Sequence, residues 1–170
     1  MAVLREREIP FAVIGAAAMA VHGVARATRD LDLLTRDARS LVPATWAALE
    51  RQRITVDIRI GDADDPLAGV IRFVEGGVAV VDVVVGRAGW QAAVVERAVS
   101  RVIEGVNVPV AGAADLITLK LYAGSPQDLW DIQQLLDVGD RAALVAQVEP
   151  MLTSLPEDAR RLWARVTSAR

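Results

Sequence analysis

The sequence predicts an α+β fold, in which a small mixed β-sheet flanked by helices is followed by a C-terminal helical bundle. Short apolar segments typical of strands occur within the first 110 residues, with helical segments between them. From residue 112 onward the pattern is helical, with breaks at Gly124, Gly139 and Pro150. Mixed strands and helices followed by a run of helices indicate the α+β class.

The first part of the chain alternates strands and helices. The predicted elements are a short helix or tail at residues 1–9, a strand at about 10–15, a helix at about 16–23, a strand at about 29–35 and a helix at about 41–52. Gly15 marks the change from the first strand to the first helix. Ser40 is expected to cap the last of these helices, with Pro43 tolerated in its first turn. Trp46 and Leu49 are three residues apart and would share its buried face.

The next segment contributes most of the predicted sheet. Strands are expected at residues 54–60, 70–74, 78–85 and 106–110, and a helix at residues 89–99. The turn Glu75-Gly76-Gly77 predicts a hairpin between the second and third of these strands. Residues 78–85 are apolar except for Asp82, which is typical of a central strand that is buried on both faces. Pro109 cannot donate to a ladder, so we expect residues 106–110 to form an edge strand.

The last sixty residues predict a run of helices. They are expected around residues 115–122, from Ser125 to about 137, at about 141–149, and from Ser154 to about 168. Ser125-Pro126-Gln127-Asp128 and Ser154-Leu155-Pro156-Glu157 both have the layout of a helix start, with a capping serine, a proline and an acid three residues after the serine. We therefore expect a sheet-containing core at residues 1–110 and a helical part at residues 111–170 that packs on it, as a single compact domain.

Composition excludes several classes of protein. The 170 residues are 53% hydrophobic, which supports a sizeable core, and the formal net charge of −3 argues against a general nucleic-acid coat. No cysteine is present, so disulfide frameworks and thiolate metal sites are excluded. No apolar run is long enough to span a bilayer, and the N-terminus lacks the apolar core of a signal peptide. We expect a cytoplasmic protein that does not contact a membrane.

Asp30 and Asp32 are the first candidate catalytic residues. They stand at the start of a predicted strand, where residues two apart point to the same face. Two carboxylates on one face suit divalent metal ions. The alternative is an exposed acidic pair that forms ion pairs with Arg26 and Arg29. Upstream, Gly15 enters a helix and offers backbone N–H groups to a phosphate, although a glycine can also simply permit a tight turn.

Asp82 is the third candidate acid. A lone carboxylate in an apolar strand is costly to bury unless it is paired or bound to a metal ion. Its alternatives are an acid that faces water at a strand end, or an acid paired with an arginine. Asp57 is a rival for the same role, because its strand also alternates and could lie beside Asp30 and Asp32.

The segment from Gly15 to Asp32 resembles the first motif of the nucleotidyltransferase superfamily, which has the DNA polymerase β-like fold. The chain is most similar to the minimal and AbiEii-like (abortive-infection) nucleotidyltransferases of bacteria. In these proteins a glycine pair or Gly-Ser begins a helix, and an Asp-x-Asp follows about fifteen residues later. The residues in step with this pattern are Gly15, Gly23, Arg26, Thr28, Asp30 and Asp32. Ala16 departs from it, since the family has serine or glycine there.

The resemblance implies a metal site and a triphosphate site. Asp30, Asp32 and Asp82 would bind Mg²⁺ or Mn²⁺, and Asp82 would help to deprotonate the attacking hydroxyl. The groups implied to bind the nucleoside triphosphate are the backbone of Gly15 and Ala16, Arg26, Thr28 and Lys120. Thr28 can instead cap the loop backbone. Lys120 is the only lysine and can instead pair with an acid such as Asp131.

Three functions remain open at this stage. The first is an enzyme that moves a nucleotidyl group from a nucleoside triphosphate to a hydroxyl on a protein or an RNA, in a toxin–antitoxin or abortive-infection setting. The resemblance implies a cognate toxin or antitoxin as a partner without deciding between them. The second is a catalytically weak protein of this fold that acts as a binding scaffold, which Ala16 favours. The third is a phosphate-binding regulator that senses a nucleotide.

The aromatic residues and the single histidine have simpler interpretations. His22 cannot by itself build a zinc site or a catalytic triad, and we expect it to pack or to bond the backbone. The four tryptophans fall at helical spacings and predict core positions. Tyr122 can stack on a base, although core packing is the more common role of such a residue.

Overall fold

The computed structural model describes residues 1–25, 27–28 and 30–168. Its helices are α1 (Ala2–Glu6), α2 (Gly15–Val21), α3 (Ala47–Glu50), α4 (Gly89–Glu96), α5 (Ala113–Ala123), α6 (Pro126–Val138), α7 (Arg141–Val148) and α8 (Glu157–Ser168), with short 3₁₀ helices η1 (Ala38–Leu41), η2 (Pro43–Thr45) and η3 (Glu149–Ser154). Its strands are β1 (Ala12–Val13), β2 (Leu31–Thr35), β3 (Thr55–Ile60), β4 (Leu67–Glu75), β5 (Val78–Gly86), β6 (Val99–Ile103) and β7 (Val106–Val110). The predicted α+β class is confirmed.

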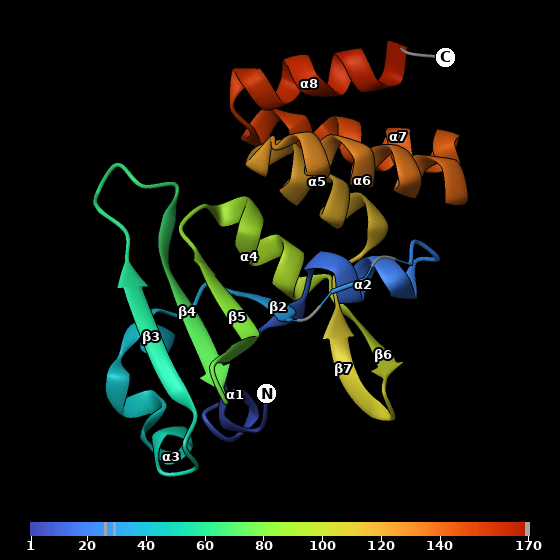
Figure 1. The fold of residues 1–170 in the computed structure, drawn as a ribbon. Helices are drawn as coiled ribbons and strands as arrows, with labels where there is room; N and C mark the ends of the chain where they lie inside the picture. The colour runs from blue at the N-terminus through green and yellow to red at the C-terminus, as the bar shows by residue number, and fades with distance from the viewer. Residues whose placement is uncertain (26, 29, 169–170) are drawn as a thin grey trace.

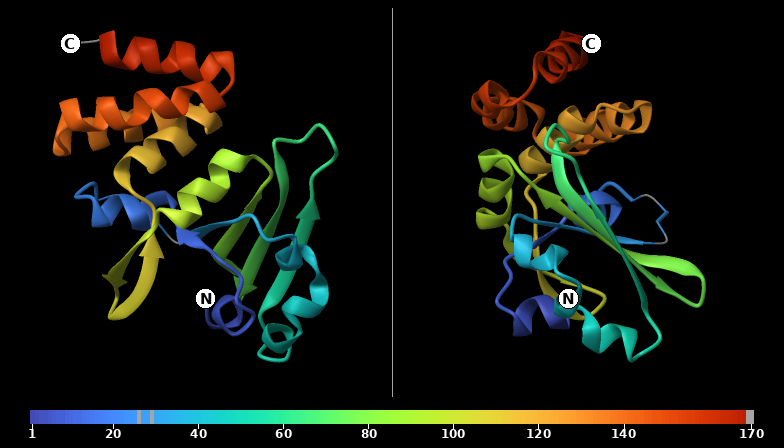
Figure 2. Two further views of the ribbon diagram at one scale, coloured as in Figure 1. Left: turned by 180° about the vertical axis from the view of Figure 1, so that it is seen from behind. Right: turned by 90° about the vertical axis from the view of Figure 1, so that its left-hand side faces the viewer.

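Among the described residues, seven strands form one mixed sheet in the order β3-β4-β5-β2-β1-β7-β6. Two neighbouring pairs are parallel, β2 with β5 and β1 with β7, and the others are antiparallel. Helices α5 to α8 follow β7 and pack together at one end of the sheet (Figure 1). The N-terminus lies at the opposite end of the molecule (Figure 2).

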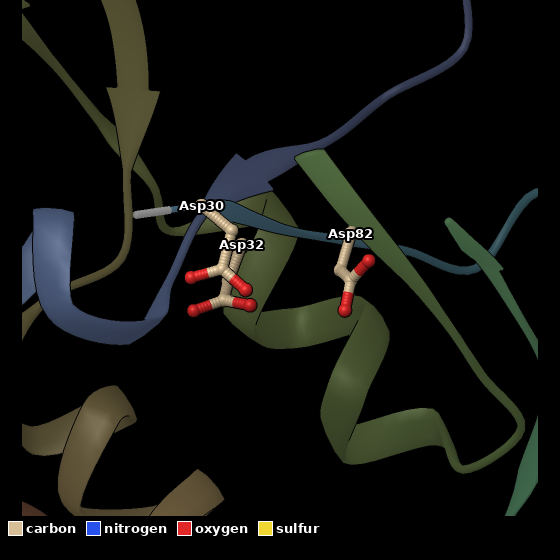
Figure 3. A group of neighbouring side chains, drawn as sticks. All are labelled: Asp30, Asp32 and Asp82. Carbon is tan, nitrogen blue, oxygen red and sulfur yellow. The ribbon is translucent and has the colours of Figure 1, made fainter. Parts of the chain in front are cut away.

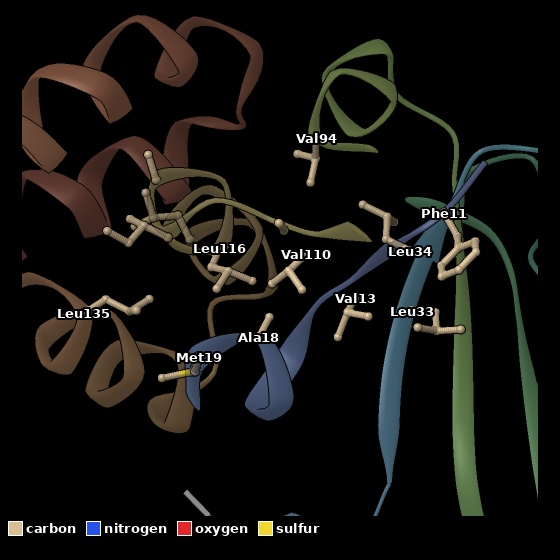
Figure 4. Close-up of a cluster of buried hydrophobic side chains, with 14 of the residues drawn as sticks. Phe11, Val13, Ala18, Met19, Leu33, Leu34, Val94, Val110, Leu116 and Leu135 are labelled. Carbon is tan, nitrogen blue, oxygen red and sulfur yellow. The ribbon is translucent and has the colours of Figure 1, made fainter. Parts of the chain in front are cut away.

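A continuous hydrophobic core joins the sheet to the C-terminal helices. Leu33 of β2, Met19 of α2, Leu116 of α5 and Leu135 of α6 all belong to one cluster of buried side chains. Figure 4 shows this cluster extending from the strands to α6. Burial of apolar surface is the main favourable term in folding, so the core holds α5 against the elements that carry the sheet. In the described part of the chain, no helix has both the length and the apolar character needed to cross a membrane.

The predicted helix at residues 41–52 is wrong. The chain forms η1, η2 and α3 there, and Val42 has an extended backbone with φ −86° and ψ 119°. Val42 precedes Pro43, and the proline ring disfavours helical geometry at the residue before it. Asp37, and not Ser40, caps the segment, because its side chain accepts a hydrogen bond from the backbone N–H of Arg39.

The helix predicted at residues 89–99 ends at Glu96, and the separate strand β6 begins at Val99. Strand β6 forms a hairpin with β7, so β6 is the edge and β7 lies inside the sheet, contrary to the prediction for residues 106–110. The hairpin turn is Glu104-Gly105, where both residues have positive φ, as a two-residue turn of this kind requires. The acid-glycine pair was a turn signal comparable to the correctly predicted Glu75-Gly76-Gly77.

The C-terminal helices follow the prediction closely. Gly124 ends α5 in the left-handed conformation, with φ 69°. Ser125 and Asp128 form a reciprocal capping box at the start of α6, with Pro126 in its first turn. The predicted boundary at residue 110 coincides with the end of β7.

Candidate active site

Strand β2 and strand β5 place three carboxylates together. Asp30 directly precedes β2, Asp32 lies on β2, and Asp82 lies directly opposite Asp32 on the parallel neighbour β5. Because neighbours in register point to the same face of a sheet, these side chains converge. One carboxylate oxygen from each of the three residues lies within 4.8 Å of the others. Figure 3 shows the carboxylates of Asp30 and Asp32 next to each other, with Asp82 extending from the adjacent strand.

Gly15 closes one side of this acidic cluster. It begins α2 with a positive φ of 62°. A Cβ atom at Gly15 would lie 2.0 Å from Oδ2 of Asp32 and 2.9 Å from its Cβ. The backbone therefore approaches the carboxylate so closely that no side chain fits, which is a stronger requirement for glycine than the turn alone.

A cavity of about 380 Å³ opens beside Gly15 and Asp32. This volume falls in the range of about 300–1,000 Å³ found for small-molecule sites. The walls are mainly apolar and come from β2, β5 and α5. They include Leu34, Val84, Leu116, Leu119 and Tyr122. Tyr122 also makes an edge-to-face contact with Trp90 on α4, with ring centroids 5.2 Å apart. The cavity thus joins an apolar wall to the acidic cluster.

Lys120 lies in the wall of the same cavity and pairs with two acids. Its Nζ is 2.5 Å from Oδ2 of Asp131 and donates to Oδ1 of Asp128 at 3.1 Å. The Lys120 side chain is 11% exposed, and that of Asp131 is fully buried. The sequence suggested the pairing with Asp131 and the capping role of Asp128, and the structure contains both. Lys120 is therefore held at the cavity by α6.

Arg72 contacts the acidic cluster, and the sequence did not reveal this position. It lies on β4 opposite Asp82 and binds it as a fork, with Nε 2.9 Å from Oδ1 and Nη2 2.6 Å from Oδ2. The hydrogen bonds and charge of Asp82 raise the pKa of the Arg72 guanidinium above its ordinary value. The open alternative in which an arginine pairs with Asp82 is thus realised, and it coexists with the convergence of the three acids.

A register shift explains why Arg72 was missed. Counting an ideal ladder from the pair Glu75 and Val78 would place Ile71 opposite Asp82. The register of β4 shifts between Phe73 and Val74, which brings Arg72 opposite Asp82 instead. A bulge of this kind changes which residue of β4 lies opposite Asp82, and no residue in the turn signals it.

Other candidate residues have defined positions. The Thr28 hydroxyl donates to the backbone carbonyl and to Oδ1 of Asp30, so it bonds the loop and one acid of the cluster. The side chain of Ala16 is buried. Arg26 and Arg29 lie outside the described residues. Asp57 lies on β3, two strands away from Asp82, and pairs with Arg59, so it does not join the cluster.

The expectations for the histidine and the tryptophans are confirmed in part. His22 bonds the backbone through Nε2, 2.8 Å from the carbonyl oxygen of Ala111, as expected. Trp46 and Trp163 are buried, and Trp90 is half-buried against Tyr122. Trp130 is 43% exposed, so the core prediction is wrong for it. It occupies a position on α6 that turns away from the buried face formed by Asp131 and Leu135.

Comparisons with known proteins agree with this geometry. The sequence model of the family described as "Nucleotidyl transferase AbiEii toxin, Type IV TA system" matches residues 2–160. The antibiotic-resistance factor ANT(2'')-Ia has a similar solution structure, with a TM-score of 0.55, 15% sequence identity, and coverage of 89% of this chain and 86% of that one. A protein from Thermotoga maritima described as a nucleotidyltransferase has a TM-score of 0.50 and 14% identity, with 80% and 87% covered. These structural matches concern the fold. Among curated proteins, no sequence is significantly similar to this chain.

Proposed function

This chain belongs to the AbiEii family of nucleotidyl transferase toxins of type IV toxin–antitoxin systems, and we propose that it transfers a nucleoside monophosphate group from a nucleoside triphosphate to a hydroxyl of a protein or an RNA. In this reaction the hydroxyl oxygen of the acceptor forms a bond to the α-phosphorus. The bond between the α-phosphorus and the bridging oxygen breaks, and pyrophosphate leaves with the electron pair. The proton of the hydroxyl passes to a base in the site.

The convergence of Asp30, Asp32 and Asp82 carries this proposal. Three carboxylates supply only hard oxygen ligands, which Mg²⁺ and Mn²⁺ prefer. The backbone of Gly15, packed against Asp32, leaves no space for a side chain in the same corner. The residues present therefore fit a divalent metal site. Bound there, such an ion supplies positive charge that stabilises the triphosphate and the leaving pyrophosphate.

The protein groups act on the two substrates in different ways. Asp82 accepts the proton of the attacking hydroxyl at one of its carboxylate oxygens, as a general base does. Thr28 orients Asp30 through its hydroxyl. The backbone N–H groups of Gly15 and Ala16 and the ammonium of Lys120 bind the phosphates, and Arg26 is a further candidate for this role. The apolar wall of the neighbouring cavity receives the nucleobase of the triphosphate and excludes water.

The setting of the reaction is a further proposal. A toxin of this kind acts with an antitoxin, so we propose a cognate antitoxin as a genetic or physical partner. We also propose that residues 1–110 form the nucleotidyltransferase core and that residues 111–170 complete the cavity through α5. The position of Lys120 and Leu116 in the cavity wall supports this division, because both belong to α5.

The experiment that tests the function measures thermal unfolding with Mg²⁺ and each of the four nucleoside triphosphates. Ligands that bind only the folded state raise Tm, and saturation at about 100 times Kd contributes about 2.7 kcal/mol. We expect a rise of several degrees that needs the metal and that is absent in the double variant Asp30→Asn/Asp32→Asn. Glu75→Gln is the matched control, because Glu75 is an exposed acid on the same sheet outside the cluster.

The outcome also separates the alternatives. A shift followed by transfer of α-labelled nucleotide to RNA or protein supports the enzyme. A shift without transfer, retained in Asp82→Asn, would indicate a nucleotide sensor. No shift with any triphosphate would reject the enzyme and favour the binding scaffold, whose partner would then be sought directly.

A further inference from the structure

The Arg72–Asp82 ion pair conflicts with the proposed use of Asp82 and leads to a further inference. Both oxygens of Asp82 accept hydrogen bonds from the Arg72 guanidinium, while the Asp82 side chain is only 11% exposed. A divalent ion shared with Asp30 and Asp32 needs an oxygen of the same carboxylate. Arg72 and the ion therefore seek the same group.

Arg72 and the other two acids lie on opposite sides of Asp82. Mg–O bonds of about 2.1 Å place two oxygens of one ion at most about 4.2 Å apart. One oxygen from each of the three carboxylates lies within 4.8 Å of the others, so the cluster is close to the size of such a site. The hydrogen bonds from Arg72 on β4 draw Asp82 away from Asp32, because β4 and β2 lie on opposite sides of β5.

Arg72 has an alternative partner on its other side. Asp57 on β3 is directly opposite Arg72 in the ladder, so the two side chains share one face of the sheet. Arg72, Asp57 and Arg59 line a groove of about 290 Å³ on that face. Arg72 is 48% exposed, which leaves its guanidinium room to move. The negative charges of Asp30 and Asp57 both add to the raised pKa of Arg72, so it is attracted from both sides.

We propose that Arg72 is a positioning residue that competes with the divalent ion for Asp82 and moves toward Asp57 when the ion binds. This inference rests on the proposed function, because it assumes that Asp82 is a metal ligand. In the absence of the ion the guanidinium neutralises Asp82 and limits repulsion within the acidic cluster. Binding of the ion releases the Arg72 guanidinium into the groove beside Asp57. The metal and the substrates thereby set the position of the carboxylate that accepts the proton.

The test is a titration of the full chain, treated with EDTA and dialysed, with Mn²⁺ as the probe. Free Mn²⁺ is measured by electron paramagnetic resonance, which reports binding without catalysis. We expect Arg72→Gln to bind Mn²⁺ about five- to tenfold more tightly, given the modest strength of a partly exposed ion pair. Arg72→Lys should also bind more tightly than wild type, because an ammonium keeps the charge and loses the planar fork. Arg101→Gln, which removes an exposed arginine on the edge strand β6, should match wild type.

Several results would overturn the competition. Weaker binding in Arg72→Gln would mean that Arg72 supports the metal site. Equal binding in Arg72→Lys and wild type, with tighter binding only in Arg72→Gln, would indicate an effect of charge alone. If Asp32→Asn abolishes binding while Arg72→Gln leaves it unchanged, the proposed function stands and the competition is wrong. If neither wild type nor Arg72→Gln binds Mn²⁺, the metal site itself is wrong.

Discussion

The backbone of Gly15 lies directly against the carboxylate of Asp32, so that a Cβ atom on Gly15 would meet Oδ2 at 2.0 Å. This contact ties the start of α2 to the acid on β2, two elements that the sequence separates by a loop. The position of Asp32 in the acidic cluster therefore requires that residue 15 has no side chain. At the same corner the cavity reaches the acidic cluster through Asp32.

The first prediction concerns this contact. Gly15→Ala should abolish metal-dependent binding of the triphosphate, because the methyl group displaces Asp32 or α2. It should also destabilise the fold by more than the roughly 1 kcal/mol that a positive φ costs alanine. Gly76→Ala is the control, since Gly76 has φ 57° and nothing within 4 Å of its added Cβ. Equal losses of stability and full triphosphate binding in both variants would show that Gly15 serves only the turn.

The second prediction concerns Asp82 as the general base. Asp82→Asn should lower nucleotidyl transfer by at least about 100-fold, in the range of general-base contributions, while the chain still folds. The variant keeps the shape of the side chain and removes its charge. Transfer is measured with α-labelled triphosphate and compared with Glu75→Gln, which should retain the wild-type rate because Glu75 is exposed at the end of β4. A wild-type rate in Asp82→Asn would assign the base to another group.

The third prediction concerns Lys120 and Asp131. Lys120→Met should destabilise the protein by roughly 3–5 kcal/mol, because it removes the ammonium that lies 2.5 Å from a fully buried carboxylate. Lys120→Met/Asp131→Leu should recover much of that stability, since it removes both charges. Urea denaturation of the single and double variants measures the coupling. Additive losses would show that the two side chains act independently. The double variant should still fail to bind triphosphate, because Lys120 is proposed to contact phosphate.

The fourth prediction concerns pH. The hydrogen bond from Arg39 lowers the pKa of Asp37 below its ordinary value of 3.8. A lowered pKa in the folded state contributes stability that is present above the ordinary value and is lost as pH falls through the folded value. Asp37→Asn should therefore lower Tm by roughly 1–2 °C at pH 7, and the difference should shrink as the pH falls below 3.8. Asparagine caps a helix about as well as aspartate, so capping is retained. An equal difference at every pH would assign the effect to capping.

Local chemistry explains which elements were predicted well. The capping box of Ser125 and Asp128 and the left-handed Gly124 involve neighbours in sequence, so the residues alone specify α5 and α6. The candidate acids followed from strand alternation and from the resemblance of the segment around Gly15. The failures had local causes too. Val42 before Pro43 interrupts the predicted helix, and Glu104-Gly105 forms a hairpin turn that was not predicted.

The sequence by itself determined the α+β class, the break between α5 and α6, and the pair Asp30 and Asp32, because these depend on side-chain type and on spacing along one segment. Only the tertiary structure decided that β5 lies beside β2. Asp82, and not Asp57, therefore lies opposite Asp32. The tertiary structure also decided that Arg72 faces Asp82, through a register shift within β4. Strand order and register come from packing between residues distant in sequence. A side chain cannot specify its partner across a sheet before that packing exists.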